Sequence, residues 1–317
     1  MTARPFTAIG IDVGGTKIAA GVVRFPEGRI LTQRIISTAP ARGGEAVLDD
    51  VAALATELAV GQSIQGVGLG VCELVGPDGR ILSANSIDWT DQPLAERLSS
   101  VGPLVIEADV RAAALAEARF GAGRPYRVFA YVTVGTGISN CLVIDGVPFV
   151  GARGATGTMA SSPMSFSCEH CHQVSRRALE DFASGLAIVA RFDRLRPGVA
   201  RNALDVFAAA AAGDNDALEV AHSAGEDLGS MIGLLVNILD PEAVVIGGGL
   251  GLSEGAYTES LVSSIRRHIW SEVHRDLPIL RASTGDAAGM LGAAAAAWNA
   301  LQTSPSRSTL SNREIER

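Results

Sequence analysis

Positively charged side chains are few in this 317-residue sequence: it has 26 lysine and arginine residues together, and Lys17 is the only lysine. The formal net charge is −8 and the sequence pI is about 5.2. No cluster of lysine or arginine forms the basic face with which a protein grips nucleic acid without regard to sequence. The composition therefore argues against nucleic acid as a partner.

Long apolar runs are also missing. The longest, around Met231–Leu239 and Ala293–Trp298, fall well short of the roughly 20 residues that span a bilayer. The chain reaches a strand-like run by Ala8 without the charged and apolar leader of a secretory signal. We therefore expect a cytoplasmic protein with no membrane partner.

What is present is typical of an ordered globular protein, with 47% hydrophobic and 19% charged residues in a chain long enough for two lobes. The pattern of the first 120 residues predicts five strands and three helices, and a similar pattern starts again at residue 128. The first block has strands at Thr7–Asp12, Lys17–Val23, Ile30–Ser37, Gln65–Val71 and Leu104–Glu107, and helices at Glu45–Val60, Pro93–Leu98 and Ala112–Phe120. The second has strands at Val128–Val134, Ile138–Ile144, Val147–Val150, Ala243–Ile246 and Pro278–Arg281, and helices at Arg176–Phe192, Asp216–Leu239, Glu254–Val273 and Asp286–Leu301.

This repetition predicts an α/β fold made of a duplicated lobe, with a cleft between the two copies where a ligand binds. We expect a small N-terminal lobe over residues 1–111 and a large C-terminal lobe over residues 112–285. Residues 303–317 are polar and poor in aromatic side chains, which predicts a disordered tail.

Each block opens with a glycine-rich turn between two strands. In Asp12–Lys17, Gly14 and Gly15 let the backbone approach an anion, Thr16 adds a hydroxyl donor, and Asp12 can position Mg²⁺ through water. Taken alone, this turn is equally well explained as a simple hairpin. The second turn, with Thr133, Gly135, Thr136 and Gly137, has the same setting, and two such turns predict phosphate binding better than coincidence does.

A third glycine-rich segment, Gly247, Gly248 and Gly249, ends the predicted strand Ala243–Ile246. A strand end without side chains lets a flat base and its ribose lie against the backbone. The phosphate-loop motif G-x-x-x-x-G-K-[ST] and a G-x-G-x-x-G between a strand and a helix are both absent from the sequence.

Together these motifs resemble the ROK family of the actin/hexokinase-like ATPase superfamily from about Ala8 to Leu301. The two turns are similar to its phosphate motifs, Leu239–Gly249 to its adenosine segment, and Asp286–Ala294 to the start of its closing helix. The resemblance implies two actin-like, ribonuclease H-like lobes, with helix 286–302 returning to the first lobe. It further implies an ATP-dependent and Mg²⁺-dependent kinase that acts on a sugar.

The resemblance also implies a catalytic base. The family sequence E-N-D-A-N-A-A-A-L-A-E is similar to Glu107–Glu117, which places its catalytic aspartate at Asp109. A carboxylate at a strand-to-helix junction can accept the proton of a primary hydroxyl as that hydroxyl attacks the γ-phosphorus. The alternative is that Asp109 only caps the following helix.

The sugar-binding residues depart from the family pattern. The family motif G-x-x-G-x-x-G-E-x-G-H is similar to Gly151–Ser161, but its sugar-binding glutamate is replaced by Thr158 and its histidine, which binds zinc and sugar, by Ser161. A downstream glutamate is present as Glu180, and Asn85 and Trp89 match the family's N-x-x-x-W motif at the entry to the sugar site. We expect Asn85, Thr158 and Glu180 to contact the sugar.

Two further departures suggest an unusual substrate. Glu73 stands where the family has a glycine near the sugar's 3-hydroxyl, and Ala108 replaces an asparagine that lies there too. With Ala108 in place of the asparagine and Glu73 in place of the glycine, the site loses an amide and gains a carboxylate. This change suits a substrate with a cationic 3-amino group, such as kanosamine. Alternatively, Glu73 points into solvent. A C7-cyclitol of the valiolone type is a competing substrate, because Thr158 and Ser161 replace groups at the anomeric end, and glucose also stays open.

The four cysteines are Cys72, Cys141, Cys168 and Cys171. We expect no disulfides in a chain of this kind. Cys168 and Cys171 with His170 or His172 occupy the region of the family's zinc motif, where a structural zinc or a metal-free loop are both compatible with the residues. The family also implies a possible homodimer and two other classes of function. A DNA-binding regulator would carry a helix-turn-helix domain before residue 12, and a non-catalytic sugar sensor would have little need for Asp109 beside two phosphate turns.

Overall fold

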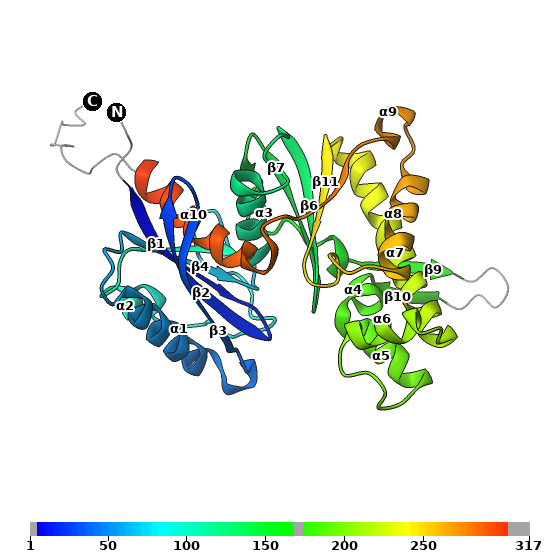
Figure 1. Cartoon of the computed structure of the whole chain (residues 1–317), viewed down its shortest axis with the longest axis horizontal. Coiled ribbons are helices and arrows are strands. Elements are labelled where there is room, and N and C mark those ends of the chain that lie inside the picture. The colour runs from blue at the N-terminus through cyan, green and yellow to red at the C-terminus, as the bar shows by residue number, and fades with distance from the viewer. Residues whose placement is uncertain (1–4, 168–173, 304–317) are drawn as a thin grey trace, which may run out of the picture.

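A computed structural model of the protein describes residues 5–167 and 174–303. The chain forms two lobes that lie side by side, with helix α3 (Asp109–Phe120) between them (Figure 1). Each lobe is built on a five-stranded mixed sheet. The predicted α/β fold with two actin-like lobes is confirmed.

The two sheets have the same strand order, as expected if the lobes are copies of one unit. In the first lobe the order is β3-β2-β1-β4-β5, and in the second it is β8-β7-β6-β11-β12. In both, the first three strands are antiparallel and the last two run parallel to the central strand. The strands are β1 (Phe6–Val13), β2 (Lys17–Phe25), β3 (Arg29–Ser37), β4 (Gly66–Val71), β5 (Leu104–Ala108), β6 (Val128–Val134), β7 (Ile138–Ile144), β8 (Val147–Pro148), β11 (Ala243–Gly247) and β12 (Ile279–Arg281).

Alternation along β1 determines which helix covers each face of the first sheet. Ile9 and Ile11 are buried in the cluster formed with α1 (Gly44–Ala59). Ala8 is buried in the cluster formed with α10 (Ala288–Thr303). α10 packs closely because Gly68 faces it: a Cβ at that position would lie 1.8 Å from the carbonyl oxygen of Ala293.

The second sheet is covered by α7 (Asn215–Leu239) and α8 (Ala256–His268) on one face and by α3 on the other. Val110, Ala113 and Ala114 of α3 pack on this sheet, while Leu115 and Ala116 pack with α10. Helix α3 therefore carries Asp109, its first residue, at the junction of the lobes. The division at residue 111 stays a prediction.

The chain passes between the lobes twice, after α3 and before α10, and Glu117 holds both passages together. Its fully buried carboxylate accepts hydrogen bonds from the backbone N–H groups of Ala122 (2.7 Å), Ser283 (3.0 Å) and Thr284 (2.7 Å). The Thr284 hydroxyl donates a fourth bond, of 2.5 Å.

Two predicted helices are wrong in extent. The residues predicted as the helix Arg176–Phe192 form the end of β10 (Val174–Ala178), α4 (Glu180–Ala183) and most of α5 (Gly185–Leu195). The prediction fails because β10 pairs with β9 (Pro163–Ser167), and because Ser184 caps a new helix by accepting a bond from Ala187 N–H. The predicted helix Glu254–Val273 divides into α8 and α9 (Glu272–Arg275). The remaining helices are α2 (Leu94–Leu98) and α6 (Ala203–Ala211).

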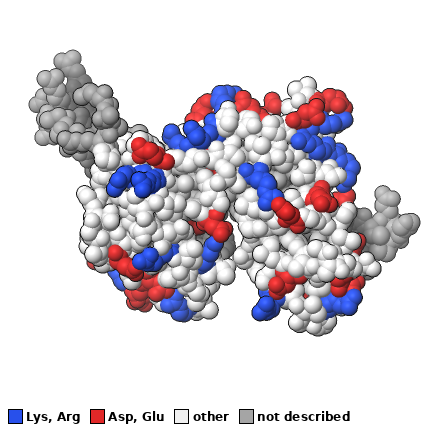
Figure 2. All heavy atoms as spheres, viewed as in Figure 1, with Lys and Arg blue, Asp and Glu red and all other residues white. Residues whose placement is uncertain are grey.

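The predicted tail falls, apart from Thr303, outside the described residues. Over the described ranges, no helix is long and apolar enough to cross a membrane. On the face shown in Figure 2, basic and acidic side chains are interspersed.

Candidate active site

A cavity of about 730 Å³ lies between the lobes and is lined by both glycine-rich turns. From the predicted phosphate-binding set it contains Asp12, Gly14, Gly15, Thr16 and Lys17 of the first turn and Thr133, Gly135, Thr136 and Gly137 of the second. Asp109 lines it as well. The structure thus brings together two turns that are about 120 residues apart in the sequence. We refer to this space as the nucleotide-side cavity.

The first turn is held by the residues around it. Gly14 N–H donates to the carbonyl oxygen of Lys17 at 3.0 Å, which closes the turn between β1 and β2. The hydroxyl of Thr38, fully buried at the end of β3, donates to the Gly14 carbonyl at 2.7 Å. Nothing lies within 4 Å of a Cβ built on Gly15, so this side of the turn is open to a ligand.

The second turn closes in the same way, with Gly135 N–H donating to the Gly137 carbonyl at 2.9 Å. A Cβ on Gly137 would lie 2.4 Å from Oε1 of Glu180, so a larger residue there would displace the Glu180 carboxylate. That oxygen accepts a bond from Ile138 N–H at 2.8 Å, so Glu180 supports the turn. The turns of the two lobes meet at their threonines, where Thr16 Oγ1 and Thr136 Oγ1 are 3.3 Å apart.

The third glycine segment is not among the residues that line this cavity. Gly248 has a φ of +79°, and a Cβ on it would lie 2.3 Å from the carbonyl oxygen of Val134. Leu250 N–H donates to the same carbonyl at 3.0 Å. Gly247 and Gly248 therefore pack beside the strand that leads into the second turn, and contact of Gly247, Gly248 and Gly249 with an adenosine stays a prediction.

Asp109 is partly buried at the start of α3, where its environment raises its pKa to about 6. Burial of the carboxyl is the largest cause, and the charge of Glu73 raises the pKa further. A hydrogen bond from Val110 N–H (2.6 Å) and the charge of Arg111 act in the opposite direction. A carboxylate with this pKa is ionised at neutral pH and basic enough to accept a proton. Helix capping does not explain why an aspartate stands at this position, because within α3 the Asp109 carboxylate accepts a bond only from the adjacent Val110 N–H.

Asp12 faces the same cavity, and its pKa is raised to about 7 by burial and by the charge of Asp109, against the charge of Lys17. Its carboxylate touches the start of α10, where a Cβ on Gly289 would lie 2.2 Å from Oδ2. In the described part of the chain, no group of three or more His, Cys, Asp or Glu could enclose a metal ion. One carboxylate with the Thr16 hydroxyl nevertheless fits Mg²⁺, which usually binds through one or two carboxylates, waters and substrate phosphates.

A smaller cavity of about 250 Å³ adjoins the nucleotide-side cavity, and the two share Asp109 as well as Cys72, Ser86, Ser139 and Glu180. Its lining includes all the predicted substrate-binding residues: Glu73, Asn85, Asp109, Thr158 and Glu180. Ala108 and Ser161, at two of the positions that depart from the family pattern, line it too. We refer to it as the sugar-side cavity.

Glu73 does not point into solvent, since only 4% of its surface is exposed. Its Oε1 accepts bonds from the N–H groups of Ser86 (2.6 Å) and Ile87 (3.0 Å). Its Oε2 accepts bonds from the Ser83 hydroxyl (2.5 Å) and Asn85 N–H (2.8 Å). Burial alone would raise the pKa of Glu73, but these four bonds outweigh it and the pKa is lowered. Glu73 is therefore an anion that fixes the loop 83–87.

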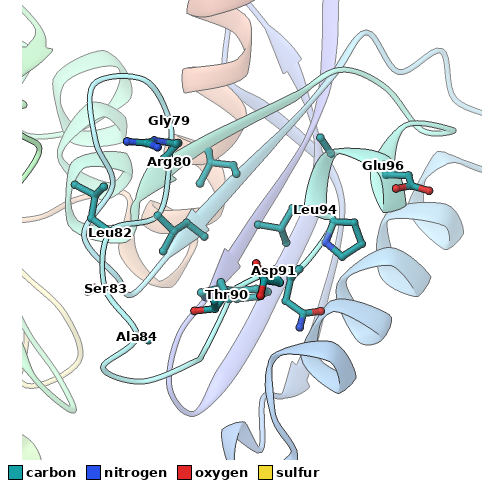
Figure 3. A pocket seen from close by; sticks show the side chains of 15 residues that line it. Gly79, Arg80, Leu82, Ser83, Ala84, Thr90, Asp91, Leu94 and Glu96 are labelled. Atoms are coloured by element: carbon teal, nitrogen blue, oxygen red, sulfur yellow. The ribbon is translucent and has the colours of Figure 1, made fainter.

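A third cavity, of about 810 Å³, lies within the first lobe and away from the two glycine turns. Figure 3 shows it between the loop that carries Arg80 and Leu82 and the segment that carries Thr90 and Leu94. None of the residues predicted to bind phosphate or sugar line it, but Trp89 of the N-x-x-x-W motif does, and Trp89 does not line the sugar-side cavity. Ser83 connects it to the site, because Ser83 lines this cavity and its hydroxyl donates to Glu73.

Other residues that line the site have no predicted role, among them Ser86, Ser139 and Arg111. Ser86 and Ser139 line both cavities of the cleft, and Arg111 lines the sugar-side cavity. Serines give no signal in a sequence because they are common in loops and turns. Arg111 could have been found, since it stands where the family pattern E-N-D-A-N has its second asparagine. The predicted zinc loop, with Cys168 and Cys171, lies outside the described residues.

Comparison with known proteins defines the class. The ROK family model matches residues 8–300, and the chain belongs to the ROK family. A glucokinase of Streptomyces coelicolor is 31% identical over 307 residues, covering 90% of this chain and 96% of that protein. An N-acetyl-D-glucosamine kinase of Escherichia coli is 30% identical over 299 residues, covering 90% and 97%.

The fold agrees with that of solved structures. A ROK family glucokinase from Streptomyces griseus, in complex with glucose and AMPPNP, superposes with a TM-score of 0.79 at 30% identity, covering 92% of this chain and 99% of that one. The ROK hexokinase of Thermus thermophilus gives a TM-score of 0.76 at 31% identity, covering 94% and 100%.

Proposed function

We propose that this protein transfers the γ-phosphate of ATP to the primary, 6-hydroxyl group of a hexose-like substrate, with Asp109 as general base. The class of activity follows from the family and its kinases: the chain is a carbohydrate kinase. The observation that supports the reaction best is that the nucleotide-side and sugar-side cavities meet at Asp109.

The residues divide the work of such a transfer. The two glycine turns bind the phosphates from opposite lobes, and Asp12 with Thr16 would hold Mg²⁺, which neutralises phosphate charge when bound. Asn85, Thr158 and Glu180 orient the sugar in the smaller cavity. Asp109 accepts the proton of the 6-hydroxyl as its oxygen attacks the phosphorus.

The Asp109→Asn substitution tests the assignment, because it keeps the shape of the side chain but removes the base. We expect kcat to fall by about a hundred- to ten-thousandfold while sugar binding is largely retained. Asp88→Asn is a matched control, since Asp88 is exposed and accepts a bond from Thr90 N–H, a bond that asparagine also accepts. Turnover of Asp109→Asn within a fewfold of the control would overturn the assignment.

For the substrate, we propose an amino sugar, best represented by the 3-amino sugar kanosamine. Three carboxylates, Glu73, Asp109 and Glu180, line the sugar-side cavity, and the one guanidinium in its lining, that of Arg111, is paired with Glu107. The resulting negative field favours a cationic substrate. It acts through space, because the four donors on Glu73 already occupy about as many positions as a carboxylate offers.

A substrate panel separates this proposal from its competitors. Even at the dielectric constant of water, two unit charges 4 Å apart interact by about 1 kcal/mol, so we expect kcat/KM for kanosamine to exceed that for glucose by at least about fivefold. A preference for glucose would refute the amino-sugar proposal. The highest value for a valiolone-type cyclitol would favour the second candidate, which Thr158 and Ser161 in the cavity lining support.

A further inference from the structure

Arg111 is a buried charge in the first turn of α3, two residues after Asp109. Only 3% of the residue is exposed, although it is an arginine. A buried charge needs an ionic partner and hydrogen bonds to offset its loss of hydration. Its contacts therefore show what the side chain does.

All three nitrogens of the guanidinium donate hydrogen bonds. Nε donates to Oε1 of Glu107 at 2.5 Å, and the two residues form an ion pair between α3 and the end of β5. Nη2 donates to the carbonyl oxygen of Val75 at 2.7 Å, and Nη1 donates to the carbonyl oxygen of Gly154 at 3.3 Å. Val75 follows β4 in the first lobe, and Gly154 follows β8 in the second. One side chain thus holds one backbone carbonyl from each lobe.

The two loops held in this way touch each other. A Cβ built on Gly154 would lie 2.1 Å from the carbonyl oxygen of Val75 and 2.7 Å from Cα of Gly76. Arg111, Gly154 and Leu74 all line the sugar-side cavity, so this contact belongs to its wall. Neither Arg111 nor Gly154 lines the nucleotide-side cavity.

We propose that Arg111 is a positioning residue that sets the width of the sugar-side cavity, by tying the loops of both lobes to the helix that begins with Asp109. The carbonyls of Val75 and Gly154 have fixed directions, and the planar guanidinium reaches both while Nε keeps its bond to Glu107. Closure of the lobes around the sugar then brings the 6-hydroxyl to the base. The kinetic part of this inference rests on the proposed sugar kinase activity, and its structural part does not.

The first test compares Arg111→Met with Arg34→Met. Arg34 makes the same kinds of bond, to a carboxylate (Glu57, 2.9 Å) and a carbonyl (Gln33, 3.0 Å), but entirely within the first lobe. We expect Arg111→Met to raise the KM for sugar about ten- to hundredfold and to leave the KM for ATP within about threefold. The control should change neither. Equal increases in both KM values would mean a general structural role and would refute the proposal.

The second test reaches the same contact from its other side and leaves Arg111 intact. Gly154→Ala puts a methyl group against the Val75 carbonyl at a residue whose φ is +75°. Gly146→Ala is its match, with a φ of +73° and nothing within 4 Å of the new methyl group. Only Gly154→Ala should weaken sugar binding. Arg111→Lys, which can reach one carbonyl at a time, should recover part of what Arg111→Met loses.

Small-angle X-ray scattering without substrate tests the tie itself. Arg111→Met and Gly154→Ala should have a larger radius of gyration than wild type, while the Arg34→Met and Gly146→Ala controls should not. An unchanged radius together with unchanged sugar binding overturns the proposal. If wild-type protein phosphorylates none of the sugars tested, the proposed function fails, and the scattering result still decides whether Arg111 ties the lobes.

Discussion

The raised pKa of Asp109 predicts how the reaction depends on pH. At its ordinary pKa of 3.8 the carboxyl would be about 94% ionised at pH 5, and the rate would hardly change between pH 7 and pH 5. With the pKa raised to about 6, the ionised fraction falls from about 91% at pH 7 to about 9% at pH 5. Because only the ionised form accepts a proton, we expect kcat/KM to fall about tenfold over this range.

The assay measures kcat/KM for the sugar at saturating Mg·ATP. Saturation is needed because Asp12, with a pKa raised to about 7, faces the same cavity and would otherwise titrate in the same range. A slowly phosphorylated sugar should be used so that proton transfer and phosphoryl transfer limit the rate. Asp109→Asn provides the baseline, since its residual activity should not follow this profile.

As the pH falls from 7 to 5, protonation of Asp109 should lower the activity but raise the stability of the folded protein. The pKa of Asp109 is higher in the folded protein than in the unfolded chain, so protonation of this group favours folding as the pH falls from 7 to 5. Thermal unfolding at each pH therefore separates lost activity from lost protein. A kcat/KM that stays constant down to pH 5 and falls only near pH 4 would refute the view that burial prepares Asp109 as the base.

Three further substitutions test how the site is held. Glu73→Gln leaves some of the four donors of the loop 83–87 without an acceptor, and we expect urea denaturation at pH 7 to show a loss of about 2–4 kcal/mol in the free energy of unfolding. The lowered pKa of Glu73 means that this difference should shrink as the pH falls below about 4.5, and a difference that does not depend on pH would contradict the role given to its charge. Glu117→Gln should cost about 1–3 kcal/mol, because the Ala122, Ser283 and Thr284 N–H groups share its carboxylate, and a loss below about 0.5 kcal/mol would show that the two passages between the lobes do not depend on it. Gly68→Ala should cost about 1–3 kcal/mol by pushing α10 from the first sheet, and unchanged denaturation would mean that the helix moves without strain.

The two glycine-rich turns could be predicted from the sequence because their signals are local. Each turn lies between two strands whose alternation is visible, and its glycines and threonines are neighbours in the sequence. The duplication of the block then places the two turns opposite each other, as the structure shows for Thr16 and Thr136. Prediction works where the chemistry is contained in five or six consecutive residues.

The residues of the sugar-side cavity could be marked in the sequence, but their contacts could not be predicted, because those contacts join distant residues. The sequence marks Glu73 as unusual, yet its partners lie 10 to 14 residues further on, and their N–H groups converge only once the loop has folded. The residues after 176 show the same limit for a helix. Their apolar spacing predicts one helix, and the pairing of β10 with β9 overrides it.

Five of the positions that depart from the family pattern lie together, and two of them are the buried charges of the sugar-side cavity. Glu73, Ala108, Arg111, Thr158 and Ser161 all line the sugar-side cavity, and none of them lines the nucleotide-side cavity. Glu73 binds the backbone N–H groups of one loop, and Arg111 binds backbone carbonyls from two others. Each charge therefore replaces a small or neutral family residue with a support for the cavity wall. Restoring the family residue at either position should therefore weaken the cavity wall, and its effect on sugar affinity should exceed its effect on the preference between sugars. Arg111→Asn should lose affinity for the neutral sugars as well as for the amino sugars in the panel, and a gain of affinity for glucose would contradict the role of Arg111 as a support of the cavity wall.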